Sequence, residues 1–370
     1  MEISSADQLR LNVLVAQPLQ AVRIDESRMC VHALSEKGEA KVELNPSCKD
    51  EKYIRLIRQF LSTHYLGSPG GYPVYLRRWT RMGQARDDSL EKLLLIGEPE
   101  AVSAVVHAAG LTNELARRAW WSSASAENAR RMLEKEDVVQ GNMGAELAQF
   151  LVEFLPFEEQ QKAIIDSVRL VLQPGLISNA MRDDLWSRGK RKNSYYVGFI
   201  QQTPHDLPID IMPHKKWSYL AKALQVEISK GNDLAKQLCL TFSSVGQAFL
   251  HTIDLVLQKP NDQDVVVALL NAIGNYFSEI NHESPRCREM QSLSAHADSA
   301  CAKNNAKVAN ILAVDASLQP QLKALFGLSM INETLVDPIF SMTDAIGSVM
   351  RKRIEPITKP LSEYLHLLRS

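Results

Sequence analysis

The sequence predicts a mostly α-helical protein, an irregular helical solenoid or bundle that begins with a small antiparallel β-meander. Two patterns support this fold class. Short alternating apolar runs occur near the start, and stripes with helical spacing follow one another after residue 86, joined by short linkers that contain Pro, Gly, Ser or Asn. A HEAT-like repeat is possible, whereas no tetratricopeptide or ankyrin signature recurs.

The predicted meander covers about residues 19–45 and consists of the runs LQAVRI, RMCVHAL and AKVEL. In the second and third runs apolar residues alternate with polar ones, as in half-buried strands, and Lys37-Gly38 suits the turn between them. Beyond Pro46, apolar residues with helical spacing predict a helix that caps the meander. The alternating residues are Met29, Val31, Ala33, Ala40, Val42 and Leu44, and the helix carries Tyr53, Ile54, Ile57, Phe60 and Leu61.

Helix signals dominate the rest of the chain. Asp88 to Glu91 resembles a capping box, and Pro99 suits the first turn of the next helix. In the tail, Asp337-Pro338 interrupts an apolar stripe over residues 331–349, which indicates a helix restart. The clearest stripe places five large side chains on one helix face: Met143, Leu147, Phe150, Leu151 and Phe154.

A domain boundary is predicted at residues 201–214, QQTPHDLPIDIMPH, because three prolines there break any periodic pattern. We therefore expect three parts. Residues 1–86 form the meander with its helix and a Gly/Pro corner, residues 87–204 a helical array, and residues 215–370 a C-terminal helical domain.

Composition places the chain among ordinary globular proteins, with 45% hydrophobic and 23% charged residues in 370. A formal net charge of −1 argues against nucleic-acid binding through the overall field of the protein. The start lacks the basic and apolar regions of a secretion signal, and no apolar run has the length of a membrane span. We expect a soluble cytoplasmic protein that does not bind a membrane.

Residues 67–84, GSPGGYPVYLRRWTRMGQ, differ from everything around them. Neither a Walker loop nor a dinucleotide-binding turn is present, so the glycines favour a structural corner. The second half combines arginines, which bind phosphate, with aromatic rings, which stack on bases. This candidate binding patch consists of Tyr72, Tyr75, Arg77, Arg78, Trp79 and Arg81.

A second basic-aromatic set lies in residues 186–196, WSRGKRKNSYY, without an acidic residue among them. Together the two sets support an RNA-binding hypothesis. The alternative is a solvated basic face above packed aromatic rings. The second set consists of Trp186, Arg188, Lys190, Arg191, Lys192, Tyr195 and Tyr196.

Five cysteines are scattered without C-x-x-C spacing, which indicates reduced, packed thiols in a cytoplasmic protein. His282 and Cys287, like His296 and Cys301, are five residues apart, a spacing that does not point both side chains of a pair to one centre on a straight helix. We expect no metal and no cofactor. Because no catalytic motif is present, we expect no catalytic residues and no enzymatic activity. A single redox-reactive cysteine is kept as an alternative.

Several stretches together resemble the DsrS family, which is encoded with the dissimilatory sulfite reductase system of sulfur-oxidising bacteria. The resemblance runs from residue 9 to about residue 200 and is much vaguer beyond. It is carried by QAVRIDESRMCVHALSEKGEAKVELNP, YLGSPGGYPVYLRRWTRMGQARDDSLEKLLLIGEPEAV, LTNELARRAWWSSASAENARRML and VEFLPFEEQQKAIIDSVRLVLQPGLI. It implies a cytoplasmic protein that assists or regulates oxidative sulfur metabolism.

These observations lead to one main functional hypothesis and two alternatives. We expect a non-enzymatic accessory or regulatory protein that recognises a protein partner of the sulfur-oxidation system. The first alternative is an RNA-binding post-transcriptional regulator that uses both basic-aromatic sets. The second is a thiol or sulfur-handling protein that uses Cys287 or Cys301.

Overall fold

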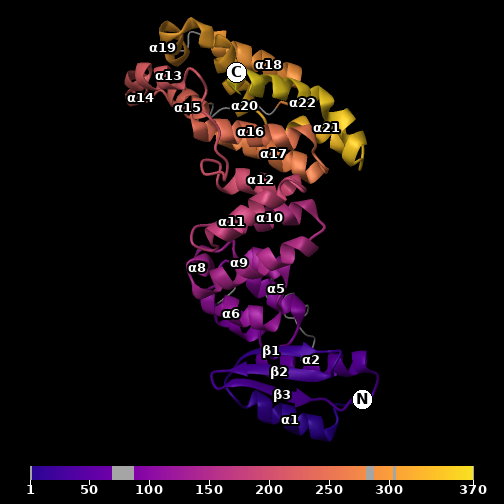
Figure 1. Cartoon of the computed structure of the whole chain (residues 1–370). Helices are drawn as coiled ribbons and strands as arrows, with labels where there is room; N and C mark the ends of the chain where they lie inside the picture. The colour runs from indigo at the N-terminus through magenta and orange to yellow at the C-terminus, as the bar shows by residue number, and fades with distance from the viewer. Residues whose placement is uncertain (1, 69–86, 281–286, 303–305, 370) are drawn as a thin grey trace. The chain divides into compact units, whose positions relative to one another are not determined.

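The computed structural model describes residues 2–68, 87–280, 287–302 and 306–369, and it is mostly helical with a small sheet near the start (Figure 1). The chain divides into two compact units, Met1–Phe154 and Leu155–Ser370. The sequence predicts three parts, with a boundary at residues 201–214. That segment lies inside the second unit, where the His214 N–H donates to the Phe242 carbonyl over 2.9 Å.

The sheet of the first unit confirms the predicted meander. Strands β1 (Leu19–Asp25), β2 (Cys30–Ser35) and β3 (Gly38–Glu43) are antiparallel in the order β1-β2-β3. Val31 pairs with Val42 and Ala33 with Ala40, so the alternating residues share one face. The β2–β3 turn is tight because Ser35 pairs with Gly38, whose φ of 113° favours glycine.

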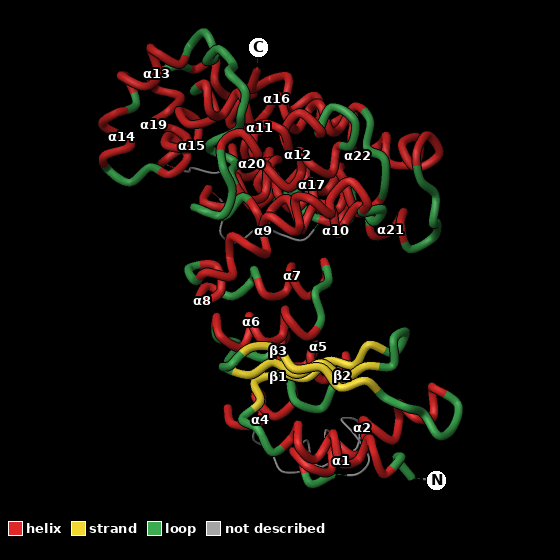
Figure 2. The backbone as a smooth tube through the Cα atoms, turned by 60° about the horizontal axis from the view of Figure 1, so that its bottom comes forward, coloured by secondary structure: helices red, strands yellow, loops and turns green. Residues whose placement is uncertain are grey.

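Helices cover both faces of this sheet (Figure 2). Helices α1 (Ser5–Val15) and α2 (Asp50–Leu66) form a core with one face, to which Leu11, Val31 and Ile57 contribute buried side chains. On the other face, Trp121 of α6 (Asn113–Ser122) lies beneath Arg23 of β1, with the guanidinium carbon 4.8 Å from the ring centroid. The predicted capping helix is therefore correct, whereas α1 was not predicted.

A buried carboxylate fixes α1 in place. Asp7 is completely buried, and its Oδ2 accepts hydrogen bonds from the Tyr53 hydroxyl of α2 at 2.6 Å and from the Asn45 backbone N–H at 2.7 Å. Its Oδ1 lies 3.5 Å from the Arg10 guanidinium. Burial, and next the bond to Asp7, raise the pKa of Tyr53, so its hydroxyl remains a donor.

Three of the remaining helices of the first unit, α4, α5 and α9, lie where the sequence predicts helices, whereas α7 and α8 had no predicted signal. Pro99 begins α5, and the predicted apolar stripe lies on α9, where the Phe150 ring contacts Trp120 at a centroid distance of 4.8 Å. These elements are α4 (Asp87–Leu93), α5 (Pro99–His107), α7 (Ala126–Met132), α8 (Glu136–Val139) and α9 (Asn142–Phe154).

The second unit is an irregular bundle. Helices distant in sequence pack together: α12 on α17, α16 on α22, and both α18 and α22 on α20. Such contacts differ from those of a solenoid, in which each repeat contacts only the repeats next to it. Its helices are η1 (Leu155–Phe157), α10 (Gln161–Val171), α11 (Asn179–Arg188), α12 (Asn193–Gln202), α13 (Trp217–Ala223), α14 (Gln225–Ser229), α15 (Asp233–Phe242), α16 (Ser244–Gln258), α17 (Gln263–Tyr276), η2 (Ser278–Ile280), α18 (Met290–Ala302), α19 (Ala306–Val314), η3 (Ala316–Leu318), α20 (Gln319–Ser329), η4 (Glu333–Leu335), α21 (Asp337–Phe340) and α22 (Gly347–Arg369).

The tail contains both a correct and a missed prediction. A helix does restart at Asp337, as α21, but it ends at Phe340. The long helix α22 contains Pro356 and Pro360, which sequence reasoning treats as helix breakers. Pro356 is exposed and Pro360 is half-buried. The carbonyls that they leave unpaired belong to the exposed residues Lys352 and Pro356, where water can satisfy them.

Within the described ranges, no single helix is long and apolar enough to cross a bilayer. The pair α15 and α16 passes the same length and composition test together, across a bend of 73°. Both helices contribute to the core of the second unit through Leu238 and Phe249.

We predict that Tyr53→Phe lowers the free energy of unfolding by about 1–3 kcal/mol, because it removes the hydroxyl that bonds the buried Asp7 carboxylate. Urea denaturation measures the change. Tyr65→Phe is the matched control, since burial raises the pKa of Tyr65 to about 12 and its hydroxyl has no hydrogen-bond partner among the described residues. Equal stabilities of the two variants would contradict the role given to Tyr53.

Candidate functional site

The first basic-aromatic set lies outside the residues that the structure describes. Its members are Tyr72, Tyr75, Arg77, Arg78, Trp79 and Arg81, within the undescribed segment 69–86.

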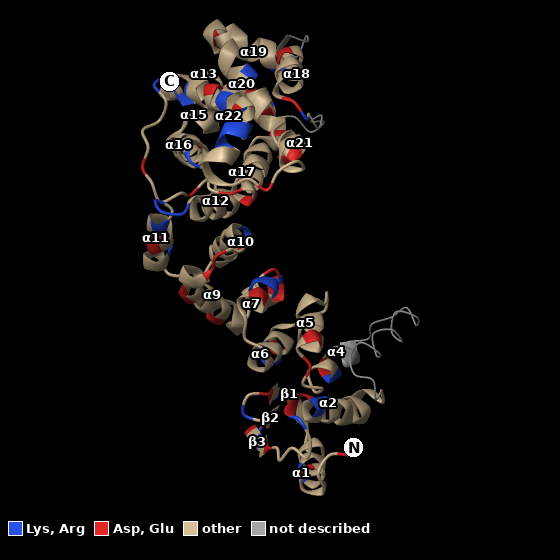
Figure 3. Cartoon of the chain, turned by 90° about the vertical axis from the view of Figure 1, so that its right-hand side faces the viewer, with Lys and Arg blue, Asp and Glu red and all other residues tan. Residues whose placement is uncertain are grey.

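The second basic-aromatic set lies at the junction of α11 and α12 (Figure 3). Its tyrosines face inward: Tyr195 is 3% exposed and Tyr196 is 6% exposed. The half-buried ring of Trp186 contacts Tyr196 with centroids 4.7 Å apart and Phe199 at 5.1 Å. A Cβ on Gly189 would lie 2.3 Å from the Tyr196 ring, so glycine permits this packing. The tyrosine rings therefore belong to the core.

The cations of this set differ in their contacts. Arg188 forms an ion pair with Asp184 at 2.6 Å, and Lys192 Nζ donates to the Glu158 carbonyl at 3.2 Å. Lys190 and Arg191 are exposed. The structure thus resembles a basic rim above packed rings more than a surface on which bases stack.

The cysteine and histidine residues of the sequence analysis are partly brought together. Cys287 is buried, with its Sγ 3.9 Å from Nδ1 of His296, and that nitrogen also lies 2.7 Å from the Ser292 carbonyl. His282 is not described. Burial raises the pKa of Cys287 and, with a smaller effect of Asp298, raises that of Cys301 to about 11. Both thiols are therefore protonated near neutral pH.

Metal-ligand side chains do not gather in the described part of the chain, where no group of three or more His, Cys, Asp or Glu residues could hold an ion.

A groove lies between α1 and β3 in the first unit. Leu9 and Val13 are four residues apart on α1, on the same side of the helix, and they are 67% and 59% exposed. The half-buried Ala40 and Val42 of β3 also line the groove. Its volume is about 570 Å³, and we call it the α1/β3 groove.

The β1 edge of the sheet is covered by other elements, whereas the β3 edge beside the groove has no further strand among the described residues. At the β1 edge, the Val22 N–H donates to the Leu94 carbonyl over 2.8 Å, and α6 packs on the strand. Strand β3 pairs with β2 alone among the described strands. The outer edge of β3 therefore offers backbone donors and acceptors beside an apolar groove.

Charged side chains border the groove. Arg10 Nη1 donates to the Glu43 carbonyl at 3.1 Å, and Lys41 forms an ion pair with Glu43 at 2.9 Å. These charges limit unspecific pairing of the edge strand, since a partner must accommodate them. Sequence reasoning missed the groove because α1 was not predicted, although Ser4, which accepts from the Asp7 N–H, was a readable cap signal.

We predict that Cys239 and Cys301 ionise near pH 11 in the folded chain, since burial raises the pKa of each thiol to about 11 from 9.0. The unfolded thiols ionise first, so their contribution to stability is complete below pH 9 and is lost as pH rises to about 11. Thiolate ultraviolet absorbance of wild type, compared with the Cys239→Ser, Cys301→Ser double variant, follows the ionisation. Midpoints near 9 in the folded protein would contradict this assignment.

Comparison with protein-family models, with curated proteins and with solved structures returns no match to this chain, so no family is assigned to it.

Proposed function

We propose that this chain is a non-enzymatic accessory or regulatory protein of cytoplasmic oxidative sulfur metabolism, which acts by binding another protein. The α1/β3 groove is the observation that carries the binding role. The metabolic setting rests on the resemblance of residues 9–200 to the DsrS family.

The proposed occupant of the groove is an extended segment of the partner, which adds a strand to β3. The edge supplies backbone hydrogen bonds, and alternate side chains of an added strand would reach Leu9 and Val13 on α1. Both side chains are more than half exposed, so their burial in a complex would be favourable. A mixed rim of Arg10, Lys41 and Glu43 selects a segment that carries both charge signs.

The two alternatives have less structural support. RNA binding through the second basic-aromatic set would have to use Lys190 and Arg191 without the buried tyrosine rings. Sulfur transfer through Cys287 would need a thiolate that burial disfavours. Neither has an observation in its favour comparable to the groove.

Photo-crosslinking at the groove tests the proposal. With p-benzoylphenylalanine at Val13, irradiation of sulfur-grown cells should give one discrete protein adduct that resists ribonuclease. Adding Leu9→Glu should reduce its yield about tenfold or more, because a charge then enters the apolar groove. Both positions are exposed, so the changes should leave thermal stability intact.

The same photoreactive residue at Glu51 is the control, since its side chain is 91% exposed and lies on α2, outside the groove. Equal adducts at both positions, or an adduct that ribonuclease removes, would overturn the proposal. An adduct between two copies of the chain would identify self-association in place of a heterologous partner.

A further inference from the structure

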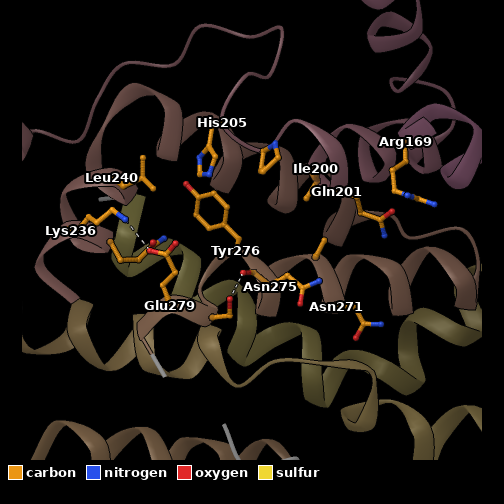
Figure 4. A pocket seen from close by; sticks show the side chains of 14 residues that line it. Arg169, Ile200, Gln201, His205, Lys236, Leu240, Asn271, Asn275, Tyr276 and Glu279 are labelled. Carbon is orange, nitrogen blue, oxygen red and sulfur yellow. Dashed lines mark hydrogen bonds and ion pairs between the residues drawn. The ribbon is translucent and has the colours of Figure 1, made fainter. Parts of the chain in front are cut away.

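The second unit contains a cavity of about 610 Å³ between α10, α12, α15 and α17. Figure 4 shows Arg169 at one end, the Lys236–Glu279 pair at the other, and the Tyr276 ring between them. The apolar part of the wall includes Ile200, Leu240 and Ala272. This volume lies within the usual range for sites that bind small molecules.

Two hydrogen-bonding groups in this wall have no partner among the described residues. Gln237 is only 4% exposed, yet its Nε2 makes no hydrogen bond. The buried Tyr276 hydroxyl makes none either, and it points toward His205 (Figure 4). Because a buried polar group without a hydrogen bond is costly, these two groups beside one cavity are available to bond a molecule that enters it.

The Tyr276 ring is held firmly by its neighbours. It stacks on Phe249 with centroids 3.6 Å apart and contacts His205 at 5.1 Å. Burial raises the pKa of Tyr276, so the hydroxyl is available as a donor. A ligand that bonds both groups must therefore present an acceptor to Tyr276 and Gln237.

The charges of the wall indicate the sign of that partner. Arg169 and Lys236 are cationic, and Glu279 is the one carboxylate in the wall. Glu279 already pairs with Lys236 at 3.1 Å, whereas Arg169 has only a 3.7 Å contact with Asp166. The formal charges of these lining residues leave an excess of one positive charge, which favours an anion.

Other ligand classes fit this wall less well. A purely apolar molecule would leave the Gln237 amide and the Tyr276 hydroxyl unpaired. A metal cation would find a single carboxylate that is engaged with Lys236. An inorganic anion alone would not use the apolar wall at Ile200 and Leu240.

We propose that this cavity is a binding site for a small organic carboxylate, whose carboxylate accepts hydrogen bonds from Gln237 Nε2 and the Tyr276 hydroxyl and whose apolar body contacts Ile200 and Leu240. Arg169 adds electrostatic attraction. Such a site would make the second unit responsive to a metabolite, independently of the α1/β3 groove.

Isothermal titration of the full chain with acetate, hexanoate, octanoate and benzoate tests this site, with octanamide as the neutral comparison. Affinity should rise from acetate to octanoate as more apolar surface is buried, and octanoate should bind about tenfold more tightly than octanamide. Higher salt should weaken the binding of octanoate but not that of octanamide, because salt screens the attraction between opposite charges.

Two variants assign the binding to the cavity. Tyr276→Phe and Gln237→Met each remove one unpaired polar group at nearly constant side-chain volume. Each should therefore lower the affinity for octanoate about tenfold. Neither should lower the melting temperature of the free protein, because no bond within the described chain is lost. Tyr65→Phe is the matched control, since that hydroxyl is also buried and unpaired but lies in the first unit.

The proposal is overturned if none of the four carboxylates binds at millimolar concentration. It is also overturned if octanoate binds equally to wild type, Tyr276→Phe and Gln237→Met, since the site then lies elsewhere. A large loss of thermal stability in both variants would show that the two groups have a structural role instead.

Discussion

The buried Asp7 carboxylate is the interaction on which the architecture of the first unit depends. It bonds the Tyr53 hydroxyl and the Asn45 backbone, and so joins α1, α2 and the segment that follows β3. A carboxylate without such bonds would be too costly to bury. Because α1 is held from its inner side, Leu9 and Val13 stay exposed beside β3. The groove is thus a consequence of how the helix is attached.

The fold class and the sheet could be predicted because their signals are local. Strand alternation placed Val31 and Val42 on one face, and Pro99 marked a helix start. The helix α22 was missed because the rule that proline ends helices ignores exposure, and the carbonyls that Pro356 and Pro360 leave unpaired belong to exposed residues. Its stability comes from packing on α16 and α20, which local sequence does not reveal.

The candidate sites were harder to predict for the same reason. The basic-aromatic composition of residues 186–196 suggested a surface, but α12 is buried almost all round, so its tyrosines enter the core. The cavity residues lie between Arg169 and Glu279 and come from several helices. No motif joins them. The cavity is a candidate binding site because two unpaired polar groups lie beside it. Only the packed structure brings these groups together, so the sequence alone does not reveal them.

The two units thus offer different surfaces for recognition: an edge strand beside an apolar groove in the first unit, and a cavity with polar and apolar walls in the second. Hydrogen exchange of the chain, free and bound to its crosslinked partner, tests the central claim most directly. An added strand predicts that amides of Gly38–Glu43 become protected in the complex, while those of α22 do not change. Protection that leaves β3 unchanged would contradict the account.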